Sequence, residues 1–108
     1  MLKKRNRLSK PFAKKNALNF SSSLFNIKIY DNSEEISRFA FVVSKKISKS
    51  AVLRNKTKRV LAKAAEETIE KIKKAKDIVI IAKKQLEFSQ TNSVQEALED
   101  VFRKLKIL

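Results

Sequence analysis

The stretch from Lys45 to Lys63 carries basic residues in a pattern that suits binding to a polyanion. Its sequence, KKISKSAVLRNKTKRVLAK, contains eight basic residues and no acidic one. It is predicted to be helical from about Val52, and the spacing of four between Arg54 and Lys58 places these cations on one side of a helix. Like charges at that spacing destabilise a helix, so an anionic partner explains the pattern better than stability does. The alternative is an ordinary solvated helix face.

The composition gives little support for catalysis by the protein itself. The chain has no His, no Cys and no Gly, which removes the usual general base, the thiolate nucleophile and the glycine loops that hold nucleotide phosphates. Neighbouring carboxylates occur at Glu34-Glu35 and Glu66-Glu67, where solvated surface charge is a simpler interpretation than a divalent ion. We therefore expect no catalytic residue and no strong metal site.

The net charge of +15 is concentrated in two segments of the 108-residue chain. Residues 1–15 contain seven basic residues and residues 45–63 contain eight, and neither segment contains an acid. The other residues hold 11 of the 26 basic residues and all 11 acidic ones, so together they are neutral. Two separate contact areas for a nucleic-acid backbone would produce this partition.

We expect a soluble, cytoplasmic protein of one domain. No apolar run approaches the ~20 residues needed to cross a membrane, and the basic N-terminus is not followed by the apolar core of a secretory signal. The length fits a single domain over residues 1–108 that begins with a basic arm over residues 1–8.

The first half of the chain is predicted to contain one short helix and two strands. The helix runs from Ser9 to about Leu18, with room for an extra short strand near residues 21–23. The segments 24–30 and 38–44 alternate in polarity as strands do, and their short connection favours antiparallel pairing. The first of these strands has a polar outer face formed by Asn26, Lys28 and Tyr30.

The second half is predicted to contain two helices and a buried strand. A long helix runs from Val52 to Ala75, and the apolar strand 77–82 is expected to be central in the sheet and buried on both faces. The last helix runs to about Leu105 and begins at Ser93, where the order S-V-Q-E fits a capping box. The order α-β-β-α-β-α predicts an α+β sandwich with helices packed on a sheet.

Two aromatic residues are candidates for stacking on unpaired bases. Phe12 lies among basic residues, and Tyr30 lies on the polar strand face. The alternatives are core packing for Phe12 and a strand-end tyrosine with its hydroxyl in water for Tyr30. Phe25, Phe39 and Phe41 are predicted to be core residues by alternation.

Several segments, taken in order, form a pattern more specific than basic charge. Residues 39–46, FAFVVSKK, end a strand in S-K-K, and residues 51–59, AVLRNKTKR, carry R-N-x-x-K-R on the following helix. The opening LKKRNRL, then Phe12, and the strand DIVIIAK at 77–83 complete the pattern. In this order they resemble the protein subunit of bacterial ribonuclease P over nearly the whole chain. Lys56 stands where that family has a second arginine, and the family's glycines around the S-K-K strand end are absent.

The resemblance implies a fold and a function. The fold is that of the second domain of a small-subunit ribosomal protein, with a left-handed βαβ crossover to the long helix. The protein is a non-catalytic subunit that binds a catalytic RNA and the 5′ leader of precursor tRNA, and it assists endonucleolytic removal of that leader. Mg²⁺ acts through the RNA, and one protein, monomeric when alone, joins one RNA.

The resemblance also implies two sets of contact residues, which coincide with the two charged segments. The set that binds the catalytic RNA lies at the start of the long helix and just before it: Arg54, Asn55, Lys56, Lys58, Arg59, Lys45 and Lys46. The set that forms the leader cleft lies between the first helix, the sheet and the basic arm: Phe12, Asn26, Lys28, Tyr30, Lys4, Arg5 and Arg7.

Two other functions remain open at this point. A small basic ribosomal protein that binds ribosomal RNA would share the charge, the fold class and the absence of catalytic residues. A DNA-binding module comes third, because the basic helix is preceded by strands and no helix-turn-helix is evident.

Overall fold

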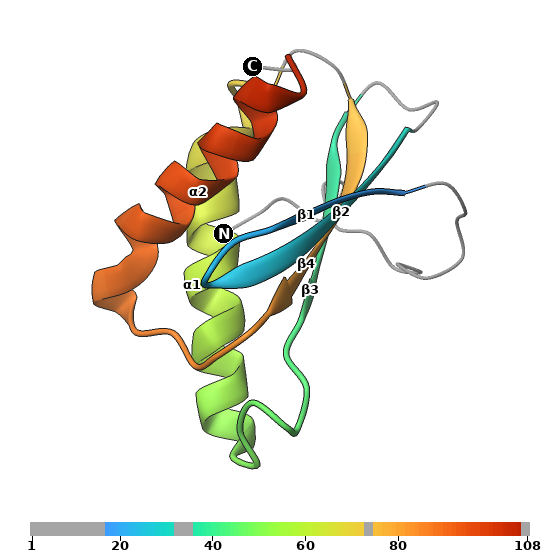
Figure 1. Cartoon of the computed structure of the whole chain (residues 1–108). Coiled ribbons are helices and arrows are strands. Elements are labelled where there is room, and N and C mark those ends of the chain that lie inside the picture. The colour runs from blue at the N-terminus through green and yellow to red at the C-terminus, as the bar shows by residue number, and fades with distance from the viewer. Residues whose placement is uncertain (1–16, 32–35, 73–74, 107–108) are drawn as a thin grey trace.

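The computed structural model describes residues 17–31, 36–72 and 75–106. These residues form a four-stranded sheet with two long helices on one of its faces (Figure 1). The elements, in chain order, are β1 (Leu18–Ser21), β2 (Phe25–Asp31), β3 (Arg38–Val42), α1 (Ala51–Ile69), β4 (Lys76–Ala82), the short 3-10 helix η2 (Phe88–Gln90) and α2 (Thr91–Lys104). The α+β sandwich is therefore confirmed.

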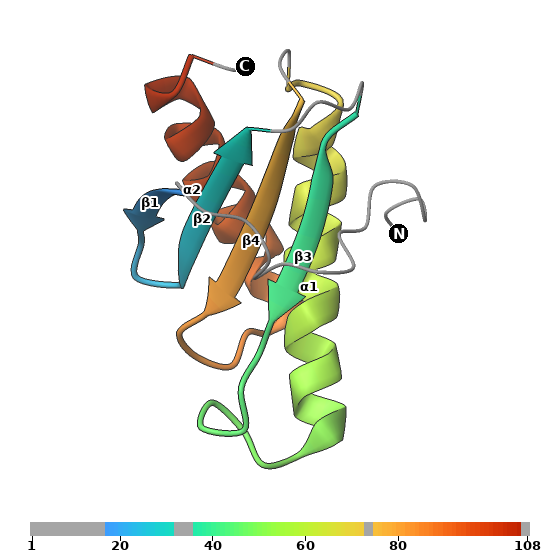
Figure 2. The ribbon, with the colours of Figure 1, turned by 90° about the vertical axis from the view of Figure 1, so that its right-hand side faces the viewer.

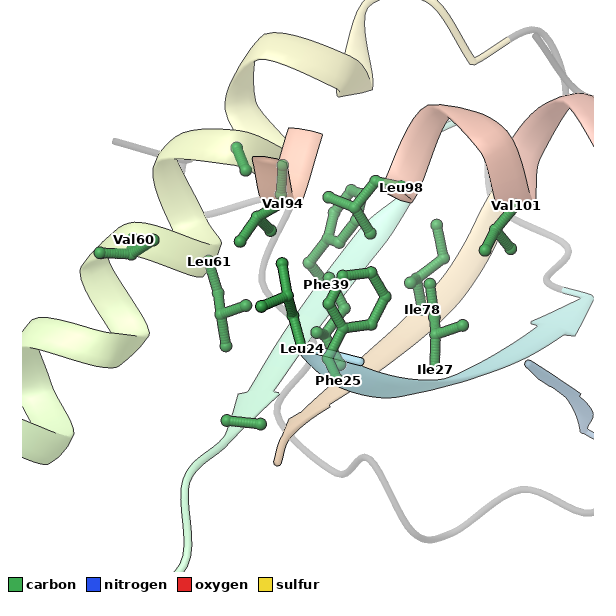
Figure 3. Close-up of a cluster of buried hydrophobic side chains, with 14 of the residues drawn as sticks. Leu24, Phe25, Ile27, Phe39, Val60, Leu61, Ile78, Val94, Leu98 and Val101 are labelled. Atoms are coloured by element: carbon green, nitrogen blue, oxygen red, sulfur yellow. The ribbon is translucent and has the colours of Figure 1, made fainter. Parts of the chain in front are cut away.

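The core lies between the sheet and the two helices (Figure 3). Alternation in β2 turns Phe25, Ile27 and Ile29 to this side, as predicted, and all three are buried. Leu61 from α1 and Leu98 from α2 meet them and are fully buried. Each such side chain contributes about 1.5–3 kcal/mol when it leaves water, so this layer supplies most of the stability of the fold.

The strand order is β1-β2-β4-β3, with β4 in the interior of the sheet. β4 pairs antiparallel with β2 and parallel with β3. The predicted pairing of β2 with β3 is therefore wrong. β4 is apolar on both faces, and residues 77–80 are all buried, so an edge position would have exposed both its side chains and its backbone donors.

The connection from β3 through α1 to β4 is a left-handed crossover. In Figure 2 the sheet faces the viewer, β3 and β4 both point down, α1 rises behind them, and β4 lies to the left of β3. Most parallel crossovers are right-handed, so this feature is uncommon, and it is the one that the resemblance implied.

The first predicted helix is wrong at its C-terminal end. Leu18 belongs to β1, which pairs with β2 through Leu18–Ile29 and Phe20–Ile27. The extra short strand therefore exists, three residues earlier than expected. Residues 9–16 of the predicted helix lie outside the described residues.

Two helix boundaries also differ from the sequence prediction. α1 ends at Ile69 rather than Ala75, with Glu70 as its C-cap, because the chain tightens into bonds of the 3-10 type from Lys71 N–H to the Thr68 carbonyl. α2 begins at Thr91, directly after η2, so Ser93 lies inside the first turn and its capping box is wrong. No helix in the described ranges is long and apolar enough to cross a membrane.

Candidate nucleic-acid interface

The loop between β3 and α1 presents three cations while its own backbone is anchored. Ile47 N–H donates to the Ser44 carbonyl at 3.0 Å, and the Ile47 side chain packs against the core. The side chains of Lys45, Lys46 and Lys49 are exposed. Figure 2 shows this loop and the first turns of α1 extending beyond the end of the strands, where a large partner has access.

Serine residues fix the point at which α1 begins. Ser50 is the N-cap, and its hydroxyl accepts a hydrogen bond from Leu53 N–H at 3.3 Å. The Ser48 hydroxyl in turn accepts from Ser50 N–H at 3.2 Å. The loop is thus joined to the helix by local hydrogen bonds, and the positions of the neighbouring cations are defined before any partner arrives.

Arg54 holds this loop in place from within the helix. Its Nη1 donates to the carbonyl oxygens of Ser48 at 2.9 Å and of Lys49 at 3.0 Å, and the side chain is half-buried. The resemblance implies an RNA contact for Arg54. The geometry adds a structural role, because loss of this guanidinium would release both carbonyls as well as remove a charge.

Lys56 faces the connection between β4 and α2 rather than open solvent. Its ammonium pairs with the Glu87 carboxylate and lies 5.6 Å from the centroid of the Phe88 ring. On the same side of α1, the buried Thr57 hydroxyl accepts a hydrogen bond from Leu86 N–H at 3.1 Å. Glu87 and Phe88 are not among the predicted site residues, because nothing in the order of residues places this connection against α1.

The remaining predicted RNA-binding residues are exposed. We call them, with the loop cations, the basic surface: Lys45, Lys46, Lys49, Asn55, Lys58 and Arg59. In the part of the chain that the structure describes, no ion pair involves any of these side chains. The first turn of α1 contains no acid, so cations gather at the positive end of the helix dipole, where an anion is the favoured neighbour.

The predicted leader-cleft residues of β2 lie on the sheet face away from the helices. Asn26 is exposed and accepts a hydrogen bond from the Ser21 hydroxyl at 2.8 Å, and Lys28 is half-buried. Tyr30 is only 6% exposed and packs with Ala40 and Val79. Apolar side chains of the neighbouring strands therefore cover most of the ring and leave little of it open for stacking on a base.

The other four leader-cleft residues, Lys4, Arg5, Arg7 and Phe12, lie outside the described ranges. The structure therefore places the predicted sets in two locations, with one set at the start of α1 and the described members of the other on the far face of the sheet. No group of three His, Cys, Asp or Glu that could hold a metal ion occurs among the described residues.

An ion pair between a partly exposed arginine and a buried aspartate joins β3 to β4 on the far face of the sheet. Arg38 binds Asp77 through two hydrogen bonds, Nε to Oδ1 and Nη2 to Oδ2, each 2.8 Å long. The Asp77 side chain is completely buried. Such a bidentate pair fixes both distance and orientation, so it holds β3 in register with β4. This pair is not evident from the sequence, because no local pattern makes the two strands neighbours.

Comparison with known proteins agrees with the motifs. The family model described as Ribonuclease P matches residues 1–106. The ribonuclease P protein component of Bacillus pumilus is 38% identical over 112 residues, which cover 95% of this chain and 90% of the relative. That of Alkaliphilus metalliredigens is 34% identical over 88 residues, which cover 82% and 78%.

Solved structures show the same fold. The RNase P protein of Staphylococcus aureus superposes with a TM-score of 0.71 at 28% identity, covering 94% of this chain and 96% of that chain. This chain therefore combines the fold of that protein with the basic start of α1 and with the sequence motifs described above. The chain belongs to the ribonuclease P protein family, whose members are the protein component of the ribonucleoprotein that processes tRNA.

Proposed function

We propose that the basic surface binds phosphates of the catalytic ribonuclease P RNA, and that the far face of the sheet, with the basic segment 1–15, binds the 5′ leader of precursor tRNA. The observation that carries the proposal is the set of exposed cations at the start of α1 that have no acidic partner among the described residues. Phosphate contacts of this kind dominate affinity for nucleic acids.

The protein acts as a positioning subunit in this proposal, and the RNA carries out the cleavage with Mg²⁺. Lysines and arginines placed where two RNA molecules meet reduce the repulsion between their backbones, so less Mg²⁺ is needed for assembly. Contact with the leader separates precursor from mature tRNA, because only the precursor has one. One protein joins one RNA, in the cytoplasm, and the protein is monomeric when alone.

Reconstitution tests the proposal directly. The purified protein is mixed with a bacterial ribonuclease P RNA at a Mg²⁺ concentration where that RNA alone is nearly inactive, and release of the leader from precursor tRNA is followed. We expect cleavage to be restored at a near-stoichiometric amount of protein. Failure to restore cleavage, combined with tight binding to ribosomal RNA, would favour the ribosomal alternative instead.

A pair of charge variants tests the basic surface itself. Lys58→Ala/Arg59→Ala should lower the slope of log affinity against log salt by up to ~2, because each cation that contacts a phosphate contributes about 0.7–0.9 to the slope. Lys104→Ala/Lys106→Asn removes two exposed cations at the end of α2 and is the matched control. Equal slopes for both variants would contradict the assignment of this surface.

A further inference from the structure

Phe88 is a large aromatic residue that the structure holds firmly but does not bury. Its side chain is 55% exposed. The backbone around it is fixed on both sides, since Glu87 N–H donates to Gln90 Oε1 at 2.8 Å and the Thr91 hydroxyl donates to the Phe88 carbonyl at 2.7 Å. Leu86, two residues earlier, is buried in the core. The ring is thus presented from a rigid support.

The surroundings of this ring connect it with the basic surface. The β4–α2 connection lies against the first half of α1 (Figure 1), and the Lys56 ammonium is 5.6 Å from the ring centroid. Val52 and Leu53, on the first turn of α1, are 76% and 37% exposed. Exposed apolar groups beside lysines and arginines match a nucleic-acid strand, which offers flat base faces and phosphates together.

Glu87 is the acidic partner of Lys56. Its carboxylate pairs with Lys56, yet the Glu87 side chain is 58% exposed and that of Lys56 is 31% exposed. Among the described residues, this is the one ion pair that reaches the segment 45–59. An exposed pair of this kind contributes little to stability, so an RNA phosphate can replace the carboxylate at small cost.

We propose that Phe88 and Lys56 form a site for one unpaired nucleotide of the bound RNA. The base stacks on the exposed face of Phe88, and the phosphate of the same nucleotide replaces the Glu87 carboxylate as the partner of the Lys56 ammonium. The site extends the basic surface around the side of α1, and the inference therefore rests on the function proposed above. Stacking on an aromatic ring is tolerant of base identity, so the site would add affinity rather than sequence preference.

Substitutions at Phe88 separate stacking from simple apolar contact. Affinity for ribonuclease P RNA is measured without tRNA at one fixed salt concentration. We expect Phe88→Ala to weaken binding by about 5- to 150-fold, the range for loss of one base stack. Phe88→Tyr should retain affinity, and Phe88→Leu should behave like Phe88→Ala. Full affinity in Phe88→Leu would overturn the inference. Thermal melting of each variant shows that loss of affinity is not loss of folding, because the ring is exposed.

A fluorescent probe reports on the site independently of affinity. The chain has no tryptophan, so Phe88→Trp introduces a single one, and a stacked base should quench its emission as RNA is added. Leu18→Trp is the matched control, because Leu18 is 53% exposed on β1, away from α1. Quenching confined to Phe88→Trp supports the inference, and equal quenching in both variants or none in either contradicts it.

Glu87→Gln tests the exchange of partners at Lys56. We expect this variant to bind RNA more tightly than the wild type. The phosphate no longer has to displace a carboxylate from the Lys56 ammonium. The Lys58→Ala/Arg59→Ala variant is measured in the same series. If it binds weakly while Phe88→Ala binds normally, the inference fails and the proposed function stands. If neither variant weakens binding, the proposed surface fails and the inference fails with it.

Discussion

The two long helices cover the same face of the sheet but arrange their charges in opposite ways. α2 has Arg103 and Lys104 in its last turn, where cations suit the negative end of the helix dipole. α1 has no acid in its first turn and no base in its last. Four of its five cations lie in its first half, and Glu66 and Glu67 lie in its second half, which is the less favourable order.

This difference agrees with the proposal that the first half of α1 binds RNA, because its charge order does not favour the helix itself. Within α2, Arg103 pairs with Asp100 and Glu99, and Glu99 also accepts a hydrogen bond from Lys71. α1 is held by packing against the hydrophobic core, in which its residues Val60 and Leu61 are fully buried. Because packing rather than surface charge stabilises α1, the exposed side of its first half is free to bind a polyanion.

The largest expected effect tests whether both helices are anchored by packing. Leu61→Ala in α1 and Leu98→Ala in α2 should each lower the free energy of unfolding by about 2–5 kcal/mol, because each removes a fully buried side chain and leaves a cavity. Chemical denaturation measures both. If Leu61→Ala lowers the free energy of unfolding by well below 1 kcal/mol while Leu98→Ala shows the full loss, core packing does not stabilise α1.

A smaller effect is expected at the cap of α1. Ser50→Ala removes the acceptor for Leu53 N–H, and we expect a loss of about 0.5–2 kcal/mol in the free energy of unfolding. Ser50→Asp is the matched control, because it keeps an acceptor and suits the helix dipole. If Ser50→Ala unfolds at the same denaturant concentration as the wild type, the hydroxyl does not determine where α1 begins.

A single charge at the start of α1 should separate stability from function. Val52 is 76% exposed in the first turn, so Val52→Glu places an anion at the positive end of the dipole and should raise the free energy of unfolding by about 0.3–1 kcal/mol. The same change should weaken RNA binding by repelling phosphates. Val52→Gln has nearly the same shape without the charge, and neither effect should appear in it.

The smallest effect concerns the balanced charges of α2. A hydrogen bond from Lys71 at 2.7 Å, opposed by partial burial, lowers the pKa of Glu99 below its ordinary value. A lowered folded-state pKa means that the stabilisation is complete above the unfolded value of about 4.3 and is lost as the pH falls through the folded one.

The stability difference between the wild type and Glu99→Gln should therefore be constant near pH 7 and shrink below about pH 4. Denaturation curves across this range measure it. Glu96→Gln, at an exposed position of the same helix, should stay within about 0.5 kcal/mol of the wild type throughout. A difference that grows as the pH falls would contradict the assigned direction.

Local patterns in the sequence predicted most elements but not their pairing. β2, β3, β4 and α2 lie within a few residues of the segments that alternation and apolar periodicity indicated. The pairing of β3 with β4 joins residues 39 apart, such as Arg38 and Asp77, and no short-range pattern encodes that contact. The predicted helix includes Leu18 for the same reason, since the strand that Leu18 belongs to is defined by its partner Ile29.

At the candidate site, the sequence predicted the residues but not their partners. The exposure of Lys58 and Arg59 follows from helix spacing, because Thr57 and Val60 take the buried positions. The bonds of Arg54 to the loop and of Lys56 to Glu87 depend on how the chain returns to α1. The burial of Tyr30 depends on Val79, which belongs to a strand that no local pattern places beside it.

The position of β4 has a consequence for how the protein is made. β4 is the interior neighbour of both β2 and β3, yet it is the last strand to leave the ribosome. Until residues 76–82 emerge, Phe39 and Ile29 have no Ile78 to pack between them. Synthesis proceeds at about 5–20 residues per second, so the nascent chain spends several seconds with its core open. We expect folding to be one late event that begins when the chain is nearly complete.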